Sequence, residues 1–387
     1  MKAKAGQKPT RARTRAYRGL PIRILTAVPI CDGHDSAITT INLELVRHGV
    51  EVIYLGYHRP VGDIVRAAIQ EDVQAVGLSS YNGGHVEFFT EVLRGLRKRG
   101  GRSIGVFGGG GGTITPADAK ILKRHGVDEI FFAGTPLDEM TRFVKHRYGK
   151  SLARTVRTAG EPTQTDWRLS KLLSAVEMGP HRITQRGPAS TRVIGVTGPG
   201  GAGKTTLIDE LVLRFLQANP TGRVAILSHD PSLVGAGALL GDRATMIYAQ
   251  DDRVFMRSLA TRGQAGGVSR GTASCLEVLK HAGFDLVIVE TVGVGQEALP
   301  FARGLVDKSV LVMSSDYGSR LQLQKIAMLD VANIVVVNKS DLPGAKTAAS
   351  EIGQRLARNH RGQQLLTTMA KRHRDAGVDK LFNEVMS

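Results

Sequence analysis

The sequence of 387 residues contains only two cysteines, Cys31 and Cys275, which lie far apart in the chain. We therefore expect no disulfide framework, and we expect the protein to reside in a reducing compartment. Long apolar runs are also missing, because no stretch approaches the roughly 20 uninterrupted apolar residues of a membrane span. No signal-peptide apolar core follows the basic N-terminus. We expect a cytoplasmic protein without a membrane partner.

Acidic residues are scarcer than basic ones, 35 against 52, and the formal net charge is +17. Residues 1–23 carry eight Lys or Arg and no Asp or Glu. This stretch contains Thr and Pro but no apolar periodicity, so it predicts a disordered basic arm over residues 1–20. No nucleic-acid recognition motif accompanies the arm, and we therefore expect it to be inert or to dock an acidic protein surface. No nucleic-acid partner is predicted.

Length and composition allow two packed domains, since 42% of the residues are hydrophobic. Over residues 21–148 short apolar runs alternate with helical patterns, which is typical of a parallel sheet covered on both faces. Strands are predicted at residues 22–29, 52–55, 73–79, 103–107 and 129–132. This pattern predicts a flavodoxin-like domain, whose ligand would bind at the carboxyl ends of the strands.

Three of these predicted strands are followed by unusual residues. The first strand is followed by Asp-Gly-His-Asp-Ser-Ala at residues 32–37, the third ends in Ser-Ser-Tyr at 79–81, and the fourth runs into five glycines at 108–112. Between Ala37 and Ser79 there are 41 residues, and between Tyr81 and Gly108 there are 26. All three segments are expected at the ligand-binding edge of the sheet.

The three motifs and both spacings resemble the cobalamin-binding signature of acyl-CoA mutases and methionine synthase, which reads Asp-x-His-x-x-Gly, Ser-x-Leu and Gly-Gly. The chain departs from it at two positions, with Ala37 in place of Gly and Tyr81 in place of Leu. The resemblance implies that residues 21–148 bind adenosylcobalamin. It identifies as cofactor-binding residues Asp32, His34, Ser79, Tyr81, Gly108 and Gly109.

In that family a histidine replaces the cofactor's own dimethylbenzimidazole as the lower axial ligand of cobalt, and His34 has this role by resemblance. An imidazole nitrogen suits the metal. Asp32 is expected to accept a hydrogen bond from the other ring nitrogen and so fix its tautomer. Gly108 and Gly109 would let the backbone approach the displaced nucleotide tail, and the Ser79 hydroxyl would bond near its base.

A strand, a glycine-rich loop and a helix open the second region. Residues 193–197 predict a strand and residues 206–216 a helix, with G-x-x-x-x-G-K-T at 198–205 between them. In this setting backbone N–H groups cradle phosphates, Lys204 reaches the β and γ groups, and Thr205 ligates Mg²⁺. The predicted nucleotide-binding residues of this loop are Gly198, Gly200, Gly201, Ala202, Gly203, Lys204, Thr205 and Thr206.

A later motif indicates which base is bound. An apolar strand predicted at residues 334–337 ends in Asn338-Lys339-Ser340-Asp341, which resembles the guanine motif of GTPases. The Asp341 carboxylate would accept two N–H donors that guanine has and adenine lacks. Adenine would leave this buried carboxylate unpaired, so GTP is favoured over ATP. Asn338, Lys339 and Asp341 are therefore predicted to bind the nucleotide.

Between these motifs, the strand predicted at residues 284–289 is followed by Glu290-Thr-Val-Gly-Val-Gly-Gln296. Ordinary GTPases have Asp where Glu290 stands. Together with His-Asp-Pro-Ser at 229–232 and Leu-Gly-Asp at 240–242, this segment resembles the small G-protein chaperones that service cobalamin-dependent mutases. The resemblance implies that Mg²⁺ is surrounded, directly or through water, by Asp230, Asp242 and Glu290, in addition to Thr205.

The same resemblance assigns further roles. The Gly293 N–H would face the γ-phosphate, and Gln296 is expected to orient the attacking water. Residues 314–324 resemble the extra switch segment of these chaperones, and residues 367–371 their last base-contacting loop. The predicted catalytic residues are Lys204, Glu290 and Gln296.

The two regions are joined by residues 149–190, which are rich in Arg, Thr, Pro and Gln and predict a linker with one helix at 168–178. We thus expect two doubly wound α/β domains, a flavodoxin-like cobalamin-binding domain over 21–148 and a P-loop G-protein chaperone domain over 191–387. Their order resembles the N-terminal part of fused isobutyryl-CoA mutase. That family continues into an acyl-CoA-binding (β/α)₈ barrel of about 250 residues, so this chain is expected to be a fragment or to pair with a barrel subunit.

The resemblance implies a GTPase that gates loading and release of adenosylcobalamin for a carbon-skeleton mutase of the isobutyryl-CoA or methylmalonyl-CoA type. Without the barrel we expect GTP hydrolysis but no isomerisation. Expected partners are the barrel subunit, a cobalamin adenosyltransferase and further copies of the chain. An alternative is a cobalamin-responsive, GTP-dependent regulatory switch without a mutase partner. A corrinoid methyl carrier would share the His34 motif but gives no reason for the GTPase motifs.

Overall fold

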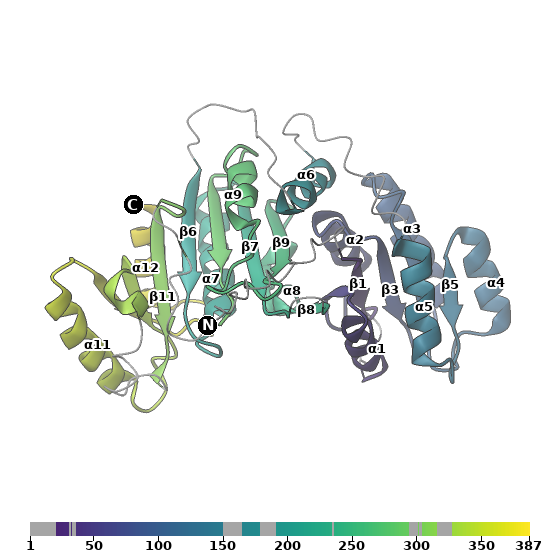
Figure 1. Ribbon diagram of the computed structural model, residues 1–387, viewed down its shortest axis with the longest axis horizontal. Helices are drawn as coiled ribbons and strands as arrows, with labels where there is room; N and C mark the ends of the chain where they lie inside the picture. Colours follow the sequence, from purple (N-terminus) through teal and green to yellow (C-terminus); the bar gives the residue numbers. More distant parts are fainter. Residues whose placement is uncertain are drawn as a thin grey trace, which may run out of the picture.

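The computed structural model contains two parallel β-sheets with helices packed on them (Figure 1). The residues that it describes are 21–30, 32, 36–149, 165–178, 191–233, 236–293, 301, 304–315 and 327–387. Two α/β units of this kind were predicted from the alternating patterns, and the fold class is confirmed. None of the helices in these ranges is both long and apolar enough to cross a membrane.

The first sheet is formed almost entirely by the first region of the chain. Its elements in chain order are β1 (Arg23–Ala27), α1 (Ser36–Arg47), β2 (Glu51–Tyr54), α2 (Val61–Gln70), β3 (Ala75–Ser79), α3 (His85–Lys98), β4 (Gly105–Gly109), α4 (Pro116–His125), β5 (Glu129–Phe131) and α5 (Leu137–Tyr148). The strand order is β5-β4-β3-β1-β2, and one strand of the second region, β8 (Ala238–Leu240), pairs with β2 at the edge.

The central strands of this sheet, β1 and β3, form where the sequence is largely apolar. All residues of β1 and β3 are buried, because α1 and α5 pack together on the sheet and α3 packs against both α2 and α4. β4 lies two residues later than predicted and contains Gly108 and Gly109. Glycine is a poor strand former, but pairing with β3 and β5 on both sides fixes these two residues in the sheet.

The second sheet belongs to the second region. Its elements are α6 (Asp166–Met178), β6 (Arg192–Thr197), α7 (Lys204–Ala218), β7 (Val224–Asp230), α8 (Asp242–Thr245), β9 (Val254–Ala260), α9 (Thr272–Lys280), β10 (Leu286–Glu290), β11 (Lys308–Met313), β12 (Ile334–Val337), α11 (Ala345–Asn359), β13 (Gln364–Thr367) and α12 (Ala376–Met386). Its order is β13-β12-β11-β6-β10-β7-β9. The phosphate-loop strand β6 therefore lies in the middle of the sheet.

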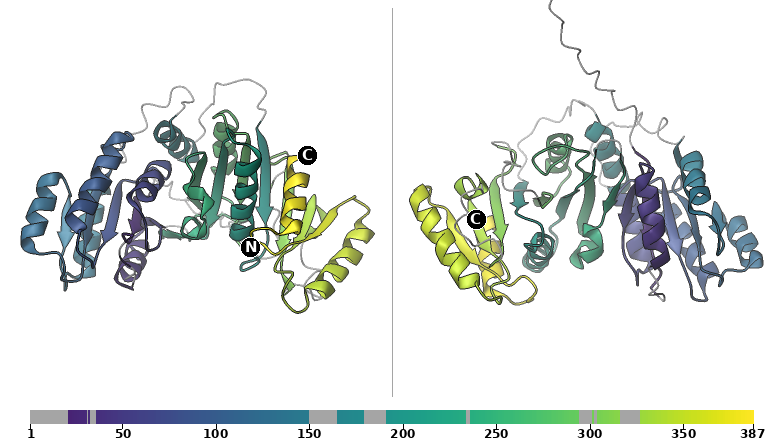
Figure 2. Two further views of the ribbon diagram at one scale, coloured as in Figure 1. Left: turned by 180° about the vertical axis from the view of Figure 1, so that it is seen from behind. Right: turned by 60° about the horizontal axis from the view of Figure 1, so that its bottom comes forward.

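The two sheets lie side by side, and the views in Figure 2 show α4 and α11 at opposite ends of the molecule. Between them, α2 buries every residue from Ile64 to Gln70, because α3 covers one side of it and α6 and β9 cover others. The peripheral helix α4 buries only Ala119 and Leu122. The two regions thus share a packed boundary, and β8 continues the first sheet across it.

Candidate functional site

A cavity of about 420 Å³ lies at the carboxyl ends of the strands of the first sheet. Ser79, Tyr81, Gly108 and Gly109 all line it, so these four predicted residues are brought together. The remaining walls are largely apolar and come from α1, α5 and the segment after β5, through Ala37, Ile38, Ile41, Phe131, Phe132, Leu137, Met140 and Val144. No charged side chain lines the cavity among the described residues. Such a lining suits a neutral, partly aromatic group.

The glycines of this cavity are required by their protein neighbours. A Cβ on Gly108 would collide with the Leu78 carbonyl oxygen and lie 2.7 Å from the Phe89 ring. A Cβ on Gly110 would collide with the Ser80 carbonyl oxygen. The run therefore lets β4 and the loop after it lie close to β3, which keeps the cavity open above them. Sequence reasoning had explained only Gly108 and Gly109, and only by the approach of a ligand.

Asp32 connects two of the predicted cofactor-binding segments. Its carboxylate is buried in the segment between β1 and α1 and accepts a hydrogen bond from the backbone N–H of Tyr81, which follows β3. His34 lies outside the described residues. Its predicted ligation of cobalt, and its predicted hydrogen bond to Asp32, stay predictions.

The phosphate-binding loop connects β6 to α7, as predicted. Gly198 has φ +146°, and a Cβ there would collide with the Val312 carbonyl oxygen. Gly203 has φ +88° and precedes α7, and a Cβ on it would lie 2.5 Å from Nδ2 of Asn338. The Lys204 ammonium donates to the carbonyl oxygens of Gly198 and Pro199 at 3.1 and 3.2 Å. The lysine therefore lies over the loop, at the start of α7, where phosphate binding requires it.

Carboxylates from three segments gather beside this loop. Glu290, at the end of β10, accepts a hydrogen bond from the Thr205 hydroxyl at 2.8 Å, and Asp242 accepts one from the Ser228 hydroxyl. Burial and the neighbouring carboxylates Asp242 and Glu290 raise the pKa of Asp230 to about 8. Burial and Asp242 likewise raise the pKa of Glu290 to about 8. Burial also lowers the pKa of the Lys204 ammonium, against the attraction of Glu290 and Asp242.

These carboxylates fit a divalent cation. Asp230 Oδ2 and Glu290 Oε2 are buried and have no hydrogen-bond partner among the described residues, an arrangement that costs free energy unless a cation binds there. No three His, Cys, Asp or Glu side chains of the described chain are close enough to hold a metal by themselves. Mg²⁺ usually keeps water and phosphate oxygens among its ligands, so the Thr205 hydroxyl and the nucleotide would complete the site.

The segment after β10 touches the phosphate-binding loop. A Cβ on Gly293 would lie 2.6 Å from both Cα and N of Gly200, so the glycine is required for this approach. Its predicted role beside the γ-phosphate stays a prediction. Gln296 lies outside the described residues, and of the predicted switch segment 314–324 only Ser314 and Ser315 lie within them.

A second cavity, of about 280 Å³, lies beside the loop at the carboxyl ends of β12 and β13. Lys339, Asp341, Thr206 and Gly203 line it, together with Lys371. Asp341 pairs with Lys371 at 2.5 Å, and the hydrogen bond from this lysine lowers the pKa of the Asp341 carboxyl. The predicted base-binding motif and the predicted last loop therefore meet at one cavity.

Asn338 connects the base cavity to the phosphate-binding loop. Its Nδ2 donates to the Ala202 carbonyl at 3.0 Å, and its Oδ1 accepts from the Thr368 hydroxyl at 3.0 Å and the Ala370 N–H at 3.1 Å. These bonds satisfy the amide and hold three loops together. The Asn338 side chain thus stabilises the walls of the cavity through hydrogen bonds to other protein groups.

Sequence reasoning missed two residues that hold the carboxylates in place. The Ser228 hydroxyl donates to Asp242, and the His229 ring contacts the Glu290 carbonyl oxygen at 2.7 Å and the Thr272 hydroxyl at 2.8 Å. Burial lowers the pKa of His229 to about 4, so the ring is neutral near pH 7. His229 directly precedes Asp230 and belongs to the motif at 229–232, which was the available signal, whereas Ser228 lies one residue before that motif.

Comparison with known proteins matches each region of the chain to a known family. The family described as "Methylmalonyl Co-A mutase-associated GTPase MeaB" matches residues 174–387, more than half of the chain, and the family described as "B12 binding domain" matches residues 22–139. A fused isobutyryl-CoA mutase of Cupriavidus metallidurans is 39% identical over 93% of this chain and 35% of its own length. Another, of Geobacillus kaustophilus, is 37% identical over 93% of this chain and 36% of its own.

Smaller GTPases also match part of the chain. A putative GTPase of Pyrococcus horikoshii is 40% identical over 42% of this chain and 51% of its own length. The chain spans about a third of the length of the fused mutases that it matches. The resemblance expected from the motifs is confirmed over both regions. The chain therefore belongs to the family of methylmalonyl-CoA mutase-associated GTPases MeaB, with a B12 binding domain preceding its GTPase region.

Proposed function

We propose that this chain holds adenosylcobalamin for an acyl-CoA carbon-skeleton mutase and that GTP hydrolysis by its second region gates loading and release of the cofactor. The observation that carries the proposal is the presence, in one chain, of a neutral cavity at the edge of one sheet and a phosphate-loop site at the edge of the other. The similarity to fused isobutyryl-CoA mutases supports it, because it extends over both regions in the same order.

In the first region the residues that line the cavity would hold the nucleotide tail of the cofactor. The apolar walls and the glycine backbone suit its dimethylbenzimidazole base, and the Ser79 hydroxyl can bond to the base or to the adjoining sugar. The buried Asp32 carboxylate would fix the loop that carries His34, since it is bonded to Tyr81. Adenosylcobalamin supplies radical chemistry when bound, and the protein supplies ligation and orientation.

In the second region the loop N–H groups and Lys204 would bind the β- and γ-phosphates of GTP. Thr205, Asp230, Asp242 and Glu290 would hold Mg²⁺, which neutralises charge that develops on the phosphates. In the complex Lys204 would exchange its bonds to the two loop carbonyls for bonds to phosphate oxygens. Gln296 would orient the attacking water, and Asp341 would accept the guanine N–H groups.

The experiment is to purify the full chain from its own cells with adenosylcobalamin and a non-hydrolysable GTP analogue present, and to identify the bound molecules by mass spectrometry. A co-purifying mutase barrel subunit would support the proposal, and its sequence would narrow the acyl-CoA. If cobalamin is retained without any mutase subunit or longer mutase chain, the proposed role in a mutase is wrong, and a cobalamin-responsive regulatory switch becomes the favoured function. The expected adenosyltransferase partner and self-association stay predictions.

A further inference from the structure

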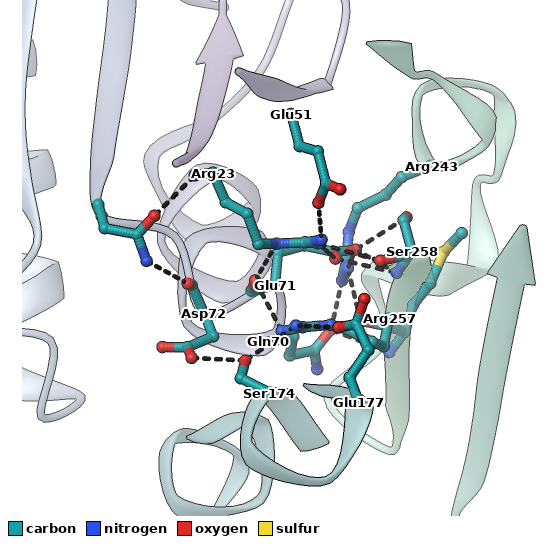
Figure 3. A network of polar contacts seen from close by, with 12 residues as sticks. Arg23, Glu51, Gln70, Glu71, Asp72, Ser174, Glu177, Arg243, Arg257 and Ser258 are labelled. Carbon is teal, nitrogen blue, oxygen red and sulfur yellow. Dashed lines mark hydrogen bonds and ion pairs between the residues drawn. The ribbon is translucent and has the colours of Figure 1, made fainter. Parts of the chain in front are cut away.

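The two regions meet across a buried network of charged and polar side chains (Figure 3). Glu71, directly after α2, lies at its centre. Its carboxylate accepts hydrogen bonds from Arg23 at 2.9 Å, from Arg243 at 3.1 Å and from the backbone N–H of Ser258 at 2.9 Å. Arg23 and Glu71 belong to the first region, and Arg243 and Ser258 to the second. Breaking one of these pairs would leave an uncompensated buried charge, which is strongly unfavourable.

Side chains of the first region also take the place of a neighbouring strand along β9, the edge strand of the second sheet. The Gln70 side-chain oxygen accepts from the Met256 N–H at 3.2 Å, and its amide donates to the Val254 carbonyl at 2.9 Å. Arg23 donates to the Ser258 carbonyl at 3.0 Å. Buried backbone groups that face outward from β9 are thereby satisfied. The end of α2 is therefore fixed against this edge.

Arg243 connects this network to the nucleotide site. It is fully buried and donates to Glu71, to the Met256 carbonyl at 3.0 Å and to the Gln70 side-chain oxygen. The residue directly before it is Asp242, one of the carboxylates beside the phosphate-binding loop. Both belong to the four-residue helix α8. Whatever fixes Arg243 therefore restricts where Asp242 can lie.

An arginine of the first region, Arg59, also holds α8. The Arg59 guanidinium donates to the Ala244 carbonyl at 2.6 Å, and its backbone N–H is bonded to the Val28 carbonyl at 3.0 Å. On the other side of Asp242, strand β8 pairs in parallel with β2, with Leu239 opposite Val52. Residues 238–244 are thus held by the first region before and after Asp242.

We propose that Arg243 and Arg59 are positioning residues for the nucleotide site, through which the cobalamin-binding region places the Asp242 carboxylate for Mg²⁺. The inference rests on the proposed function, because it takes Asp242 to be part of the Mg²⁺ site. The inference goes beyond the proposed function in one respect. The position of the Asp242 carboxylate in the Mg²⁺ site would be set by Glu71, Gln70 and Arg59, none of which belongs to the GTPase region.

The competing explanation is that the network only stabilises the boundary. Arg66 of α2 and Asp252 form a control for this, since they pair across the same boundary at 2.5 Å, and among the described residues neither is hydrogen-bonded or ion-paired to α8. Asp252 is 74% exposed, so Asp252→Asn should fold normally. The half-buried Arg59 can be replaced in Arg59→Ala, which removes the hydrogen bond to the Ala244 carbonyl of α8. Arg243→Lys keeps the positive charge but removes the planar guanidinium that bonds to Glu71 and Gln70 together.

The test measures, in the full chain, the Mg²⁺ concentration that gives half-maximal GTP hydrolysis and, separately, the affinity for GDP without Mg²⁺. We expect the half-maximal Mg²⁺ concentration to rise roughly fivefold or more for Arg59→Ala and Arg243→Lys, as for a typical coupling between sites. GDP affinity without Mg²⁺ should stay unchanged. Asp252→Asn should leave both quantities as in the wild type.

Two results would overturn the inference. One is an unchanged Mg²⁺ requirement in Arg59→Ala, which decides the matter even if Arg243→Lys fails to fold. The other is a fold-loss of GDP affinity without Mg²⁺ as large as the fold-rise in the half-maximal Mg²⁺ concentration, which indicates general destabilisation of the region. In both cases Mg²⁺-dependent hydrolysis by the wild type would still support the proposed function. A wild-type chain that needs no Mg²⁺ would overturn both proposals.

Discussion

The two candidate ligand sites lie at the carboxyl ends of the strands in two similar sheets. They differ in the kind of residues that form them. In the first region the described lining of the cavity has glycine backbone, hydroxyls and apolar side chains, and no charged group. In the second, a lysine and three carboxylates gather within a few residues of the strand ends. The parallel sheet supplies the location in both cases. The residues that follow the strands decide which chemistry is possible there.

The difference also explains what each site tolerates. A charged site depends on a few groups that contact the ligand, so the loss of one group should remove function while leaving the fold. A cavity built by close backbone packing depends on the absence of side chains, so added atoms should damage the fold and the function together.

The largest effect is expected for Lys204→Ala. Because the ammonium would stabilise charge on the transferring phosphate, GTP hydrolysis should fall by about 100-fold or more. Adenosylcobalamin binding should change little, since among the described residues the Lys204 ammonium donates its hydrogen bonds to carbonyls of its own loop and lines no part of the first cavity. Phosphate release and cobalamin absorbance measure the two activities. Equal loss of both would contradict the separation of the sites.

Asp341→Asn should weaken GTP binding, because an amide cannot accept both guanine N–H groups. The expected loss is about 1.5–3 kcal/mol, the range for hydrogen bonds to a charged group. Binding is measured with a fluorescent GTP analogue and competing ATP. Lys371→Met is the control, since it removes the 2.5 Å ion pair but keeps the carboxylate. A variant that keeps its preference for GTP over ATP would refute base recognition by Asp341.

Gly110→Ala should damage the first site through its fold. The added Cβ would collide with the Ser80 carbonyl oxygen, and the backbone shift should cost about 1–3 kcal/mol of stability. Cobalamin affinity should fall, while GTP hydrolysis at low temperature is retained. Gly62→Ala in α2 is the control, because no atom lies within 4 Å of its added Cβ. Normal cobalamin binding by the Gly110 variant would show that the glycine run is dispensable.

The smallest effect concerns Cys275, which lies in α9 outside both sites. Burial raises the pKa of its thiol above the ordinary value. Above about pH 8.5 the thiol ionises in the unfolded chain but stays protonated in the folded one, so stability should fall as the pH rises. Denaturation at pH 7 and pH 10 should show a larger loss for the wild type than for Cys275→Ala. Equal losses would contradict the prediction.

The contrast between the sites parallels what could be predicted from the sequence. The phosphate-binding loop was predicted residue by residue, because local spacing alone defines it, and the structure places it between β6 and α7. For the first site the motifs indicated which strand ends matter, and Ser79, Tyr81, Gly108 and Gly109 indeed line one cavity. The reason for the glycines was only partly foreseen. Gly110 is required by the Ser80 carbonyl, which pairing of β3 with β4 brings next to it.

The sequence by itself determined the two α/β units, the phosphate-binding loop and the strand ends that line the two cavities, because local periodicity and motif spacing encode them. Only the tertiary structure decided that β8 joins the sheet of the other region and that Gln70, Glu71 and Arg243 meet across the boundary. Those partners lie more than 170 residues apart in the chain. No local pattern signals such a pairing, since it is selected by the free energy of satisfying buried charges and strand edges in the folded molecule.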